Sequence, residues 1–204
     1  MKVPQFCYKP LLVIALGNSG AGKDTLAAEL VELGNWRRLS FGDSLRADMA
    51  ANGQPSPGPD KERDLDSDGL CFKDRMVAYA EAHRLSAPYR YPRLALESFK
   101  YTGSHVIATD CRRPVELLAL LAQHEDYNVF LVYVQRDSSG PTYKLDGLLF
   151  DAVLGDFEVS EYTHVIRNYG QSAAEAGEDM AARLRDIVTR KMPLSASTVG
   201  KAFQ

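Results

Sequence analysis

Residues 11–25 read LLVIALGNSGAGKDT: an apolar run, a glycine-rich turn and the start of a helical pattern. The run from Leu11 to Leu16 is too short for a buried helix, and it lacks the alternation of a half-exposed strand. Both features are typical of a strand that is covered on its two faces. Residues 17–23 then fit the pattern G-x-x-x-x-G-K, which has structural meaning when it follows a strand and precedes a helix. We therefore expect a strand, a phosphate-binding loop and a helix in succession.

The chemistry expected of this loop follows from its backbone. Glycines allow a tight turn in which successive N–H groups point at phosphate oxygens. The next helix adds its unpaired N-terminal donors and the positive end of its dipole, and Lys23 can reach the β- and γ-phosphates as a compact charge. A glycine turn without a ligand would leave Lys23 with no role, so we expect ATP as the ligand. The predicted phosphate-binding residues are Asn18, Ser19, Gly20, Ala21, Gly22, Lys23, Asp24 and Thr25.

The residue after the lysine departs from the common pattern. Serine or threonine usually stands there and binds Mg²⁺, whereas this chain has Asp24, followed by Thr25. A carboxylate binds Mg²⁺ well, either directly or through water. Alternatively, Asp24 is a first-turn helix residue stabilised by the dipole, and Thr25 binds the metal. Both readings predict a Mg²⁺ site beside the loop.

The rest of the chain alternates between apolar runs and amphipathic helical stretches. Further strands are predicted at 105–109, 129–134 and 163–166, with a weaker one at 37–41. Helices are predicted at 25–33, 43–51, 114–124 and 173–190. Strands that alternate with helices indicate a parallel sheet with right-handed crossovers. The expected fold class is therefore α/β, with a parallel sheet flanked by helices.

A second polar cluster follows the run at 105–109. Asp110 would lie at the carboxyl end of a parallel strand, where such sheets bind ligands, and beside a phosphate-binding loop it is suited to steer Mg²⁺. Arg112 and Arg113 can bind phosphate with bidentate geometry. Alternatively, Asp110 or Glu116 caps the next helix and the arginines form surface ion pairs. The predicted metal ligands are Asp24, Thr25 and Asp110.

The composition of the 204 residues argues against several functional classes. A net charge of −3 gives no global basic field that would attract nucleic acid or an anionic membrane. The three cysteines and four histidines show no ligand spacing, which argues against a disulfide framework and a zinc site. No apolar stretch approaches the roughly 18 residues of a membrane-spanning helix. We expect a soluble, cytoplasmic protein whose partners are small nucleotides.

Four motifs occur in one order: GKDT at 22–25, FGDSL at 41–45, DCRRPVE at 110–116 and VIRNYG at 165–170. The series resembles the phage-type deoxynucleoside monophosphate kinases, which belong to the nucleoside-monophosphate kinase group of P-loop proteins. Their patterns are GKDT, F-A-D-x-L-K, D-V-R-F-x-N-E and I-x-N-D-G. The resemblance covers roughly residues 10–190, and its first and third motifs are the specific ones. Departures from these patterns, which leave the accepted base open, are Gly42, Arg46, Cys111, Arg113 and Val115.

The resemblance implies an adenylate-kinase-like, three-layer fold in a single domain, residues 1–204. Its core would comprise about residues 10–42, 102–135 and 161–190, with an acceptor-binding segment at about 43–100 and a lid at about 136–160. The implied reaction is transfer of the γ-phosphoryl group of ATP to a (deoxy)nucleoside monophosphate, with Mg²⁺ as cofactor. Such a protein would act in the cytoplasm, which is the host cytoplasm if it is phage-encoded, and it could form a homodimer.

The same resemblance implies residue roles. Arg136 follows the run at 129–134 and would belong to the lid, whose arginines neutralise charge in the transition state. Ordinary helix surface remains the alternative for the arginines of the acceptor segment, and Asp43 could instead be the N-cap of a helix at 44–51. The predicted catalytic residues are Lys23, Asp24, Arg112 and Arg136. The predicted substrate-binding residues are Asp43, Arg75, Arg93 and Arg113.

Two other functions fit parts of the sequence. The same scaffold hosts kinases that act on other small metabolites, and fold alone does not choose among them. A nucleotide-binding switch or adaptor without a small acceptor is the third reading. It is disfavoured because the chain has no N-K-x-D string for guanine recognition. It also carries an arginine-rich segment that a simple switch would not need.

Overall fold

The computed structural model describes residues 9–18, 20–54, 69–99, 103–136, 163–169 and 172–191. The chain divides into two compact units. One comprises Met1–Leu39 and Phe99–Gln204, and the other is Ser40–Ser98. The second unit has nearly the bounds that the resemblance implies for an acceptor-binding segment, about 43–100. Its role stays a prediction, as does the description of the chain as a single domain.

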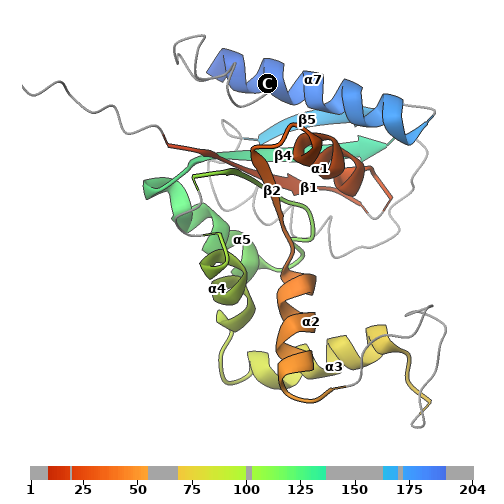
Figure 1. Ribbon diagram of the computed structural model, residues 1–204, viewed down its shortest axis with the longest axis vertical. Helices are drawn as coiled ribbons and strands as arrows, with labels where there is room; N and C mark the ends of the chain where they lie inside the picture. The colour runs from red at the N-terminus through yellow and green to blue at the C-terminus, as the bar shows by residue number, and fades with distance from the viewer. Residues whose placement is uncertain are drawn as a thin grey trace, which may run out of the picture. The chain divides into compact units, whose positions relative to one another are not determined.

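The first unit is built on a parallel sheet of five strands. The strands are β1 (Leu11–Leu16), β2 (Trp36–Leu39), β3 (His105–Ala108), β4 (Asn128–Arg136) and β5 (Thr163–Asn168). Their order is β2-β3-β1-β4-β5, with β1 in the centre (Figure 1). The register places Val13 of β1 between Ile107 of β3 and Phe130 of β4. Because all five strands are parallel, their carboxyl ends lie at one edge of the sheet.

Helices cover both faces of this sheet. α1 (Lys23–Glu32) and α7 (Ala173–Lys191) lie on one face, and α5 (Pro114–Leu121) lies on the other (Figure 1). Among the described residues, helices connect β1 to β2, β2 to β3 and β3 to β4, and α7 follows β5, so the chain begins each of these parallel strands in the same direction. The α/β class predicted from the sequence is confirmed, as is the arrangement in three layers that the resemblance implies.

The central strand shows why its residues are apolar throughout. Leu11, Val13 and Ala15 belong to the core beneath α1 and α7. The alternate residues Leu12 and Ile14 face the opposite side of the sheet, because side chains alternate along a strand. All five are at most 3% exposed. Burial of a leucine, isoleucine or valine stabilises a fold by roughly 1.5–3 kcal/mol, so a polar residue in β1 would destabilise the first unit.

The start of α2 (Phe41–Ala51) corrects two sequence-based predictions. The strand predicted at 37–41 ends at Leu39, because Ser40 caps the helix that follows. The side-chain oxygen of Ser40 accepts a hydrogen bond of 3.1 Å from the backbone N–H of Asp43. Asp43 therefore lies in the first turn of the helix and is not its N-cap. A carboxylate is favourable there because it faces the positive end of the helix dipole.

Other elements also differ from their predicted bounds: the strand predicted at 163–166 continues to Asn168, and the helix predicted at 25–33 is Lys23–Glu32. The helix predicted at 114–124 ends at Leu121 and is followed by a 3₁₀ turn, η1 (Ala122–Glu125). Strand β4 extends beyond its predicted end to Arg136. Arg136 is thus the last residue of a strand, and the rest of the predicted lid, 137–160, lies outside the described residues.

The second unit contains the helices α2, α3 (Phe72–Arg84) and α4 (Arg90–Glu97). Its apolar core is a cluster drawn from all three helices, namely Leu45, Met49, Phe72, Ala80 and Tyr91. Residues from each helix therefore hold this unit together.

A partly buried polar network adds to this core. Asp48 of α2 accepts hydrogen bonds from Arg90 of α4, with Oδ1 at 2.6 Å from the guanidinium, and from the hydroxyl of Tyr79 of α3, at 3.1 Å. Burial alone would raise the pKa of Asp48, but the hydrogen bonds from Arg90 and Tyr79 outweigh it and hold the pKa below its usual value. The carboxylate consequently stays ionised and joins the three helices.

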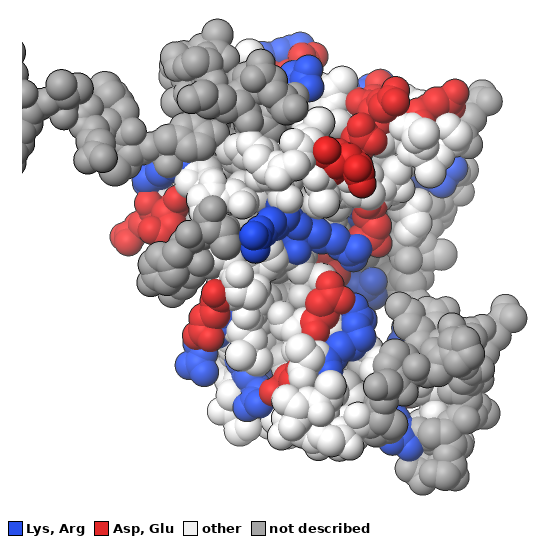
Figure 2. Space-filling view, viewed as in Figure 1, with Lys and Arg blue, Asp and Glu red and all other residues white. Residues whose placement is uncertain are grey.

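Charges of both signs are interspersed on the face of the molecule shown in Figure 2. This distribution accords with the net charge of −3. None of the helices in the described part of the chain combines the length and the apolar composition that a membrane span requires.

Candidate functional site

The loop after β1 requires glycine at two positions. At Gly17, φ is 135° and a Cβ atom would lie 2.2 Å from the carbonyl oxygen of Val134 on β4. At Gly22, φ is 105° and a Cβ atom would lie 2.5 Å from Nδ2 of Asn168 on β5. Residues with a Cβ atom rarely adopt such φ values. The two glycines therefore let the loop pass close to β4 and β5 while it turns into α1.

Lys23 is the first residue of α1, and its ammonium group lies against the loop. Nζ donates a hydrogen bond of 2.8 Å to the carbonyl oxygen of Asn18 and another to that of Gly17. A backbone hydrogen bond of 3.2 Å from Ala21 to Asn18 closes the turn. The positive charge that the sequence assigns to phosphate binding is thus held at the loop itself.

A buried amide group supports the loop from the sheet. Asn168, the last residue of β5, is 5% exposed, and its Nδ2 donates a hydrogen bond of 2.9 Å to the carbonyl oxygen of Ala21. This bond ties the loop after β1 to the end of β5, although β4 lies between the two strands. The sequence placed Asn168 within the VIRNYG motif but gave it no role of its own.

A cleft of ≈ 290 Å³ lies at the carboxyl edge of the sheet. Its walls come from the loop, α1, the ends of β4 and β5, the segment after β3 and the start of α7. The lining residues are Gly20, Gly22, Lys23, Asp24, Thr25, Thr109, Asp110, Arg112, Arg136, Asn168, Ser172, Ala173 and Ala176. The fold thus brings together the four residues predicted to be catalytic and the three predicted to bind the metal.

Three other predicted residues of the first unit do not line the cleft. Asn18 and Ala21 belong to the loop, where their carbonyl oxygens accept hydrogen bonds from side chains. Arg113 is the N-cap residue of α5. Ser19 lies outside the described residues. Phosphate or substrate binding by these four residues stays a prediction.

Oxygen ligands for Mg²⁺ gather in the cleft without forming a complete protein cage. Asp24, Thr25 and Asp110 line it together. Within the described ranges, no group of three or more His, Cys, Asp and Glu side chains could hold a metal ion. Mg²⁺ is commonly held by one or two carboxylates, and water and substrate phosphates complete its shell. The donor set therefore fits a Mg²⁺ ion that arrives with a nucleotide.

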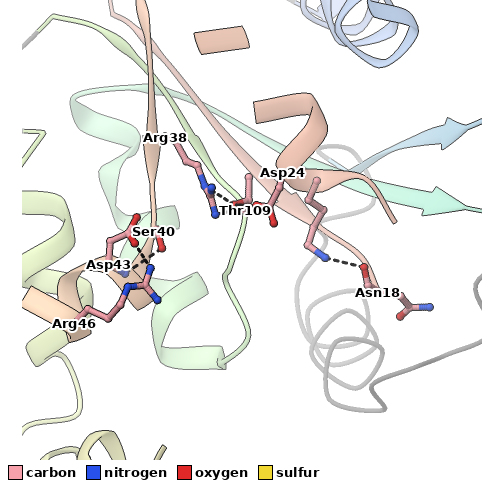
Figure 3. Close-up of polar contacts among 8 residues, drawn as sticks. Asn18, Asp24, Arg38, Ser40, Asp43, Arg46 and Thr109 are labelled. Carbon is pink, nitrogen blue, oxygen red and sulfur yellow. Dashed lines mark hydrogen bonds and ion pairs between the residues drawn. The ribbon is translucent and has the colours of Figure 1, made fainter. Parts of the chain in front are cut away.

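Asp24 has partners that the sequence did not reveal. Its Oδ1 accepts a hydrogen bond of 2.8 Å from the hydroxyl of Thr109 and forms an ion pair of 2.9 Å with Arg38 of β2 (Figure 3). Arg38 Nε also donates to the hydroxyl of Thr109, at 3.3 Å. Strand β2 reads WRRL, and nothing in the sequence distinguishes Arg38 from Arg37.

The turn that carries Arg112 is held by the cap of α5. Oε2 of Glu116 accepts hydrogen bonds from the backbone N–H groups of Arg112, at 2.8 Å, and Arg113, at 3.0 Å. Glu116 is only 5% exposed, and Pro114 occupies the first helical position, where its missing N–H has no cost. Glu116 thus caps α5, as one of the alternatives expected, while Arg112 lines the cleft.

The remaining predicted substrate-binding residues belong to the second unit. Asp43 forms an ion pair with Arg46 in α2, and Arg93 lies 3.6 Å from Glu97 in α4. Arg75 lies in α3. Exposed ion pairs within one helix contribute little to stability. These contacts therefore do not explain why Asp43 and Arg93 occur at their positions. Their role in binding a substrate stays a prediction.

Comparisons with known proteins do not assign this chain to a family. No family model matches the chain, and no curated protein matches it significantly. Similar solved structures include an APS kinase from Mycobacterium tuberculosis in complex with AMPPNP and APS, with 18% identity, a TM-score of 0.41, and coverage of 86% of this chain and 98% of that one. A dephospho-CoA kinase from Campylobacter jejuni has 12% identity, a TM-score of 0.48, and coverage of 86% and 96%. The protein TT1252 from Thermus thermophilus has 17% identity, a TM-score of 0.46, and coverage of 90% and 99%. At such values these likenesses establish neither an activity nor a substrate for this chain.

Proposed function

We propose that this protein is a P-loop kinase that transfers the γ-phosphoryl group of ATP to a (deoxy)nucleoside monophosphate and so forms the diphosphate. The observation that carries the proposal is the cleft at the glycine loop, which Lys23, Asp24, Asp110, Arg112 and Arg136 all line. Phosphoryl transfer demands positioning and charge stabilisation from a protein rather than covalent chemistry. A cleft that combines cations with carboxylates at a phosphate-binding loop is suited to supply both.

The residues divide the task between them. The backbone N–H groups of the loop and the ammonium group of Lys23 bind the phosphates of ATP. Arg112 and Arg136 offset the charge that spreads over the transferring group. Asp24, Thr25 and Asp110 would hold a Mg²⁺ ion, which would neutralise part of the phosphate charge. The phosphoryl group passes directly from ATP to the acceptor oxygen, with no covalent intermediate on the protein.

The choice of acceptor rests on the resemblance to the phage-type monophosphate kinases. Its support is the GKDT and DCRRPVE motifs at 22–25 and 110–116. Asp43, Arg75 and Arg93 are the residues that would bind the acceptor if the resemblance extends to the second unit. A kinase that acts on another small metabolite would share the ATP site and differ in these residues, so the acceptor needs a test separate from that of ATP binding.

The test is a coupled assay of ADP release with MgATP and, in turn, dAMP, dCMP, dGMP, dTMP and their ribose counterparts. We expect at least one monophosphate to accelerate ADP release. The variant Lys23→Ala should lower that rate by about a hundredfold or more, because it removes a donor of charge stabilisation. Lys9→Ala is the matched control, since Lys9 is exposed and, among the described residues, donates a hydrogen bond to the carbonyl oxygen of His124.

Each outcome of the assay separates the readings. Undiminished phosphotransfer by Lys23→Ala, with a melting temperature like that of the wild type, would contradict the proposed site. ATP binding without a response to any monophosphate would instead favour another metabolite as the acceptor. Strong ATP hydrolysis that no monophosphate changes would favour a nucleotide switch.

A further inference from the structure

Arg38 does not line the cleft, yet it contacts two residues that do. Its terminal guanidinium nitrogen lies 2.9 Å from Asp24 Oδ1, and its Nε donates to the hydroxyl of Thr109 at 3.3 Å. Thr109 in turn donates to the same Oδ1 at 2.8 Å. The three side chains close a triangle that joins β2, the residue after β3 and the first turn of α1 (Figure 3).

This triangle makes the two oxygens of Asp24 unequal. Oδ1 takes both donors, whereas Oδ2 accepts no hydrogen bond from any residue that the structure describes. Thr109 is 2% exposed, so its hydroxyl is a fixed point rather than a mobile surface group. Two donors on one oxygen fix the rotation of the carboxylate, and a single oxygen is left for a ligand.

We propose that Arg38 is a positioning residue of the nucleotide site: with Thr109 it orients Asp24 so that Oδ2 alone is presented to the Mg²⁺ ion of bound MgATP. This inference rests on the proposed function, because it assumes a MgATP site at the glycine loop. It also assigns Asp24, rather than Thr25 alone, a part in holding the metal. Arg38 acts through Asp24 and touches neither the nucleotide nor the metal.

Two opposite effects of Arg38 on Mg²⁺ affinity must be compared. Its positive charge opposes the binding of a cation by Asp24, while its contacts orient the carboxylate. The side chains of Arg38 and Asp24 are 43% and 71% exposed, and exposed ion pairs change an equilibrium by about fivefold at most. Residues that orient metal ligands typically change metal affinity by about 10–100-fold. Orientation therefore outweighs charge, and loss of Arg38 should weaken Mg²⁺ binding.

The experiment measures the affinity of a fluorescent, non-hydrolysable ATP analogue as a function of Mg²⁺ concentration. In Arg38→Met, we expect the Mg²⁺ concentration for half-maximal enhancement of binding to rise by about tenfold or more. Affinity without Mg²⁺ should stay within about twofold of the wild type. Arg37→Met is the matched control, since Arg37 is the exposed neighbour on the same strand, and it should change neither value. Arg38→Lys should recover part of the loss, because lysine restores the charge but not the fork that reaches both partners.

A double-mutant cycle separates positioning from a general structural effect. Asp24→Ala should raise the Mg²⁺ requirement by itself, and Arg38→Met should then add less than about twofold in that background. An equal effect of Arg38→Met with and without Asp24 would overturn the inference, as would a Mg²⁺ requirement within about twofold of the wild type. Melting temperatures identify a variant that fails to fold. If Arg38→Met fails to fold, the Mg²⁺ requirements of Arg38→Lys and Thr109→Val test the inference in its place. Wild-type protein that binds no MgATP would instead contradict the proposed function itself.

Discussion

Asn168 supports the glycine loop through a hydrogen bond that water cannot easily replace. Its Nδ2 donates to the carbonyl oxygen of Ala21 at 2.9 Å in a buried setting. Asn168→Leu keeps the approximate volume and removes the donor, which should lower the free energy of unfolding by about 1–3 kcal/mol. Because the loop loses an anchor, the variant should also bind the ATP analogue more weakly. Urea unfolding and analogue titration measure the two effects.

Asn128 provides a matched control for this prediction. Its Nδ2 donates to the carbonyl oxygen of Lys9, also at 2.9 Å, but the bond is exposed. Asn128→Leu should change the free energy of unfolding by no more than about 0.5 kcal/mol. Equal losses of unfolding free energy in Asn128→Leu and Asn168→Leu would contradict the prediction, because burial of the hydrogen bond would then make no difference to stability.

The residues of the site divide into those that a single sequence can predict and those that it cannot. Lys23 and Asp110 were predicted because each stands at a fixed place in a local pattern, after a glycine loop or at a strand end. Arg38 and Asn168 act through partners that are far away in the sequence, Asp24 and Ala21. An arginine in a strand has no local signal that indicates a partner far away in the sequence, so only the folded sheet reveals the partner.

At the level of elements, the cap of α5 is the feature that connects stability with the site. Oε2 of Glu116 accepts two backbone hydrogen bonds, one of them from Arg112 of the cleft. Glu116→Ala removes a buried carboxylate that accepts two backbone hydrogen bonds, so we expect the free energy of unfolding to fall by about 1.5–3 kcal/mol. The turn that positions Arg112 should loosen, and phosphotransfer should fall as well. Chemical unfolding and the ADP-release assay test both expectations.

The capping box of α7 gives the control for α5. Ser172 and Glu175 exchange two hydrogen bonds of 3.2 Å, and both bonds are exposed. Glu175→Ala should therefore cost only about 0.5–1 kcal/mol, as is usual for exposed caps. If the two glutamate variants lost equal stability, the burial of Glu116 would have no energetic consequence and the prediction for α5 would fail.

The ends of elements were the part of the fold that sequence patterns predicted least well. Around Ser40, several residues could cap a helix, and the hydrogen bond from Asp43 to Ser40 decides among them only in the folded chain. Strand β4 continues through polar residues to Arg136 because β5 lies beside it, with Arg136 opposite Asn168. Apolar periodicity detects the buried middle of such a strand and misses a polar end that pairing extends.

In the first unit, the cleft and the buried histidine His105 lie at opposite ends of the sheet. The cleft lies at the carboxyl ends of the strands, whereas His105 is the first residue of β3, at their amino ends. Its Nδ1 accepts a hydrogen bond of 2.9 Å from the backbone N–H of Leu11, and its ring lies 5.0 Å from that of Trp36. His105 thus joins the starts of β1, β2 and β3. Its ring must be neutral for Nδ1 to accept a proton donor, and burial lowers its pKa to about 4.

This lowered pKa makes the stability of the protein depend on pH in a defined direction. The unfolded chain takes up a proton on His105 below about pH 6.5, whereas the folded protein resists protonation until about pH 4. The stabilisation is therefore complete above pH 6.5 and is lost as the pH falls toward 4. At pH 5 the loss amounts to about 2 kcal/mol.

His105→Asn keeps an acceptor for the Leu11 N–H but cannot titrate, so the difference in unfolding free energy between pH 7 and pH 5 should shrink by about that amount. Urea unfolding at the two pH values measures it, with His124→Asn as the control because His124 is exposed. A His105→Asn protein with the pH dependence of the wild type would show that this histidine is not the group that titrates.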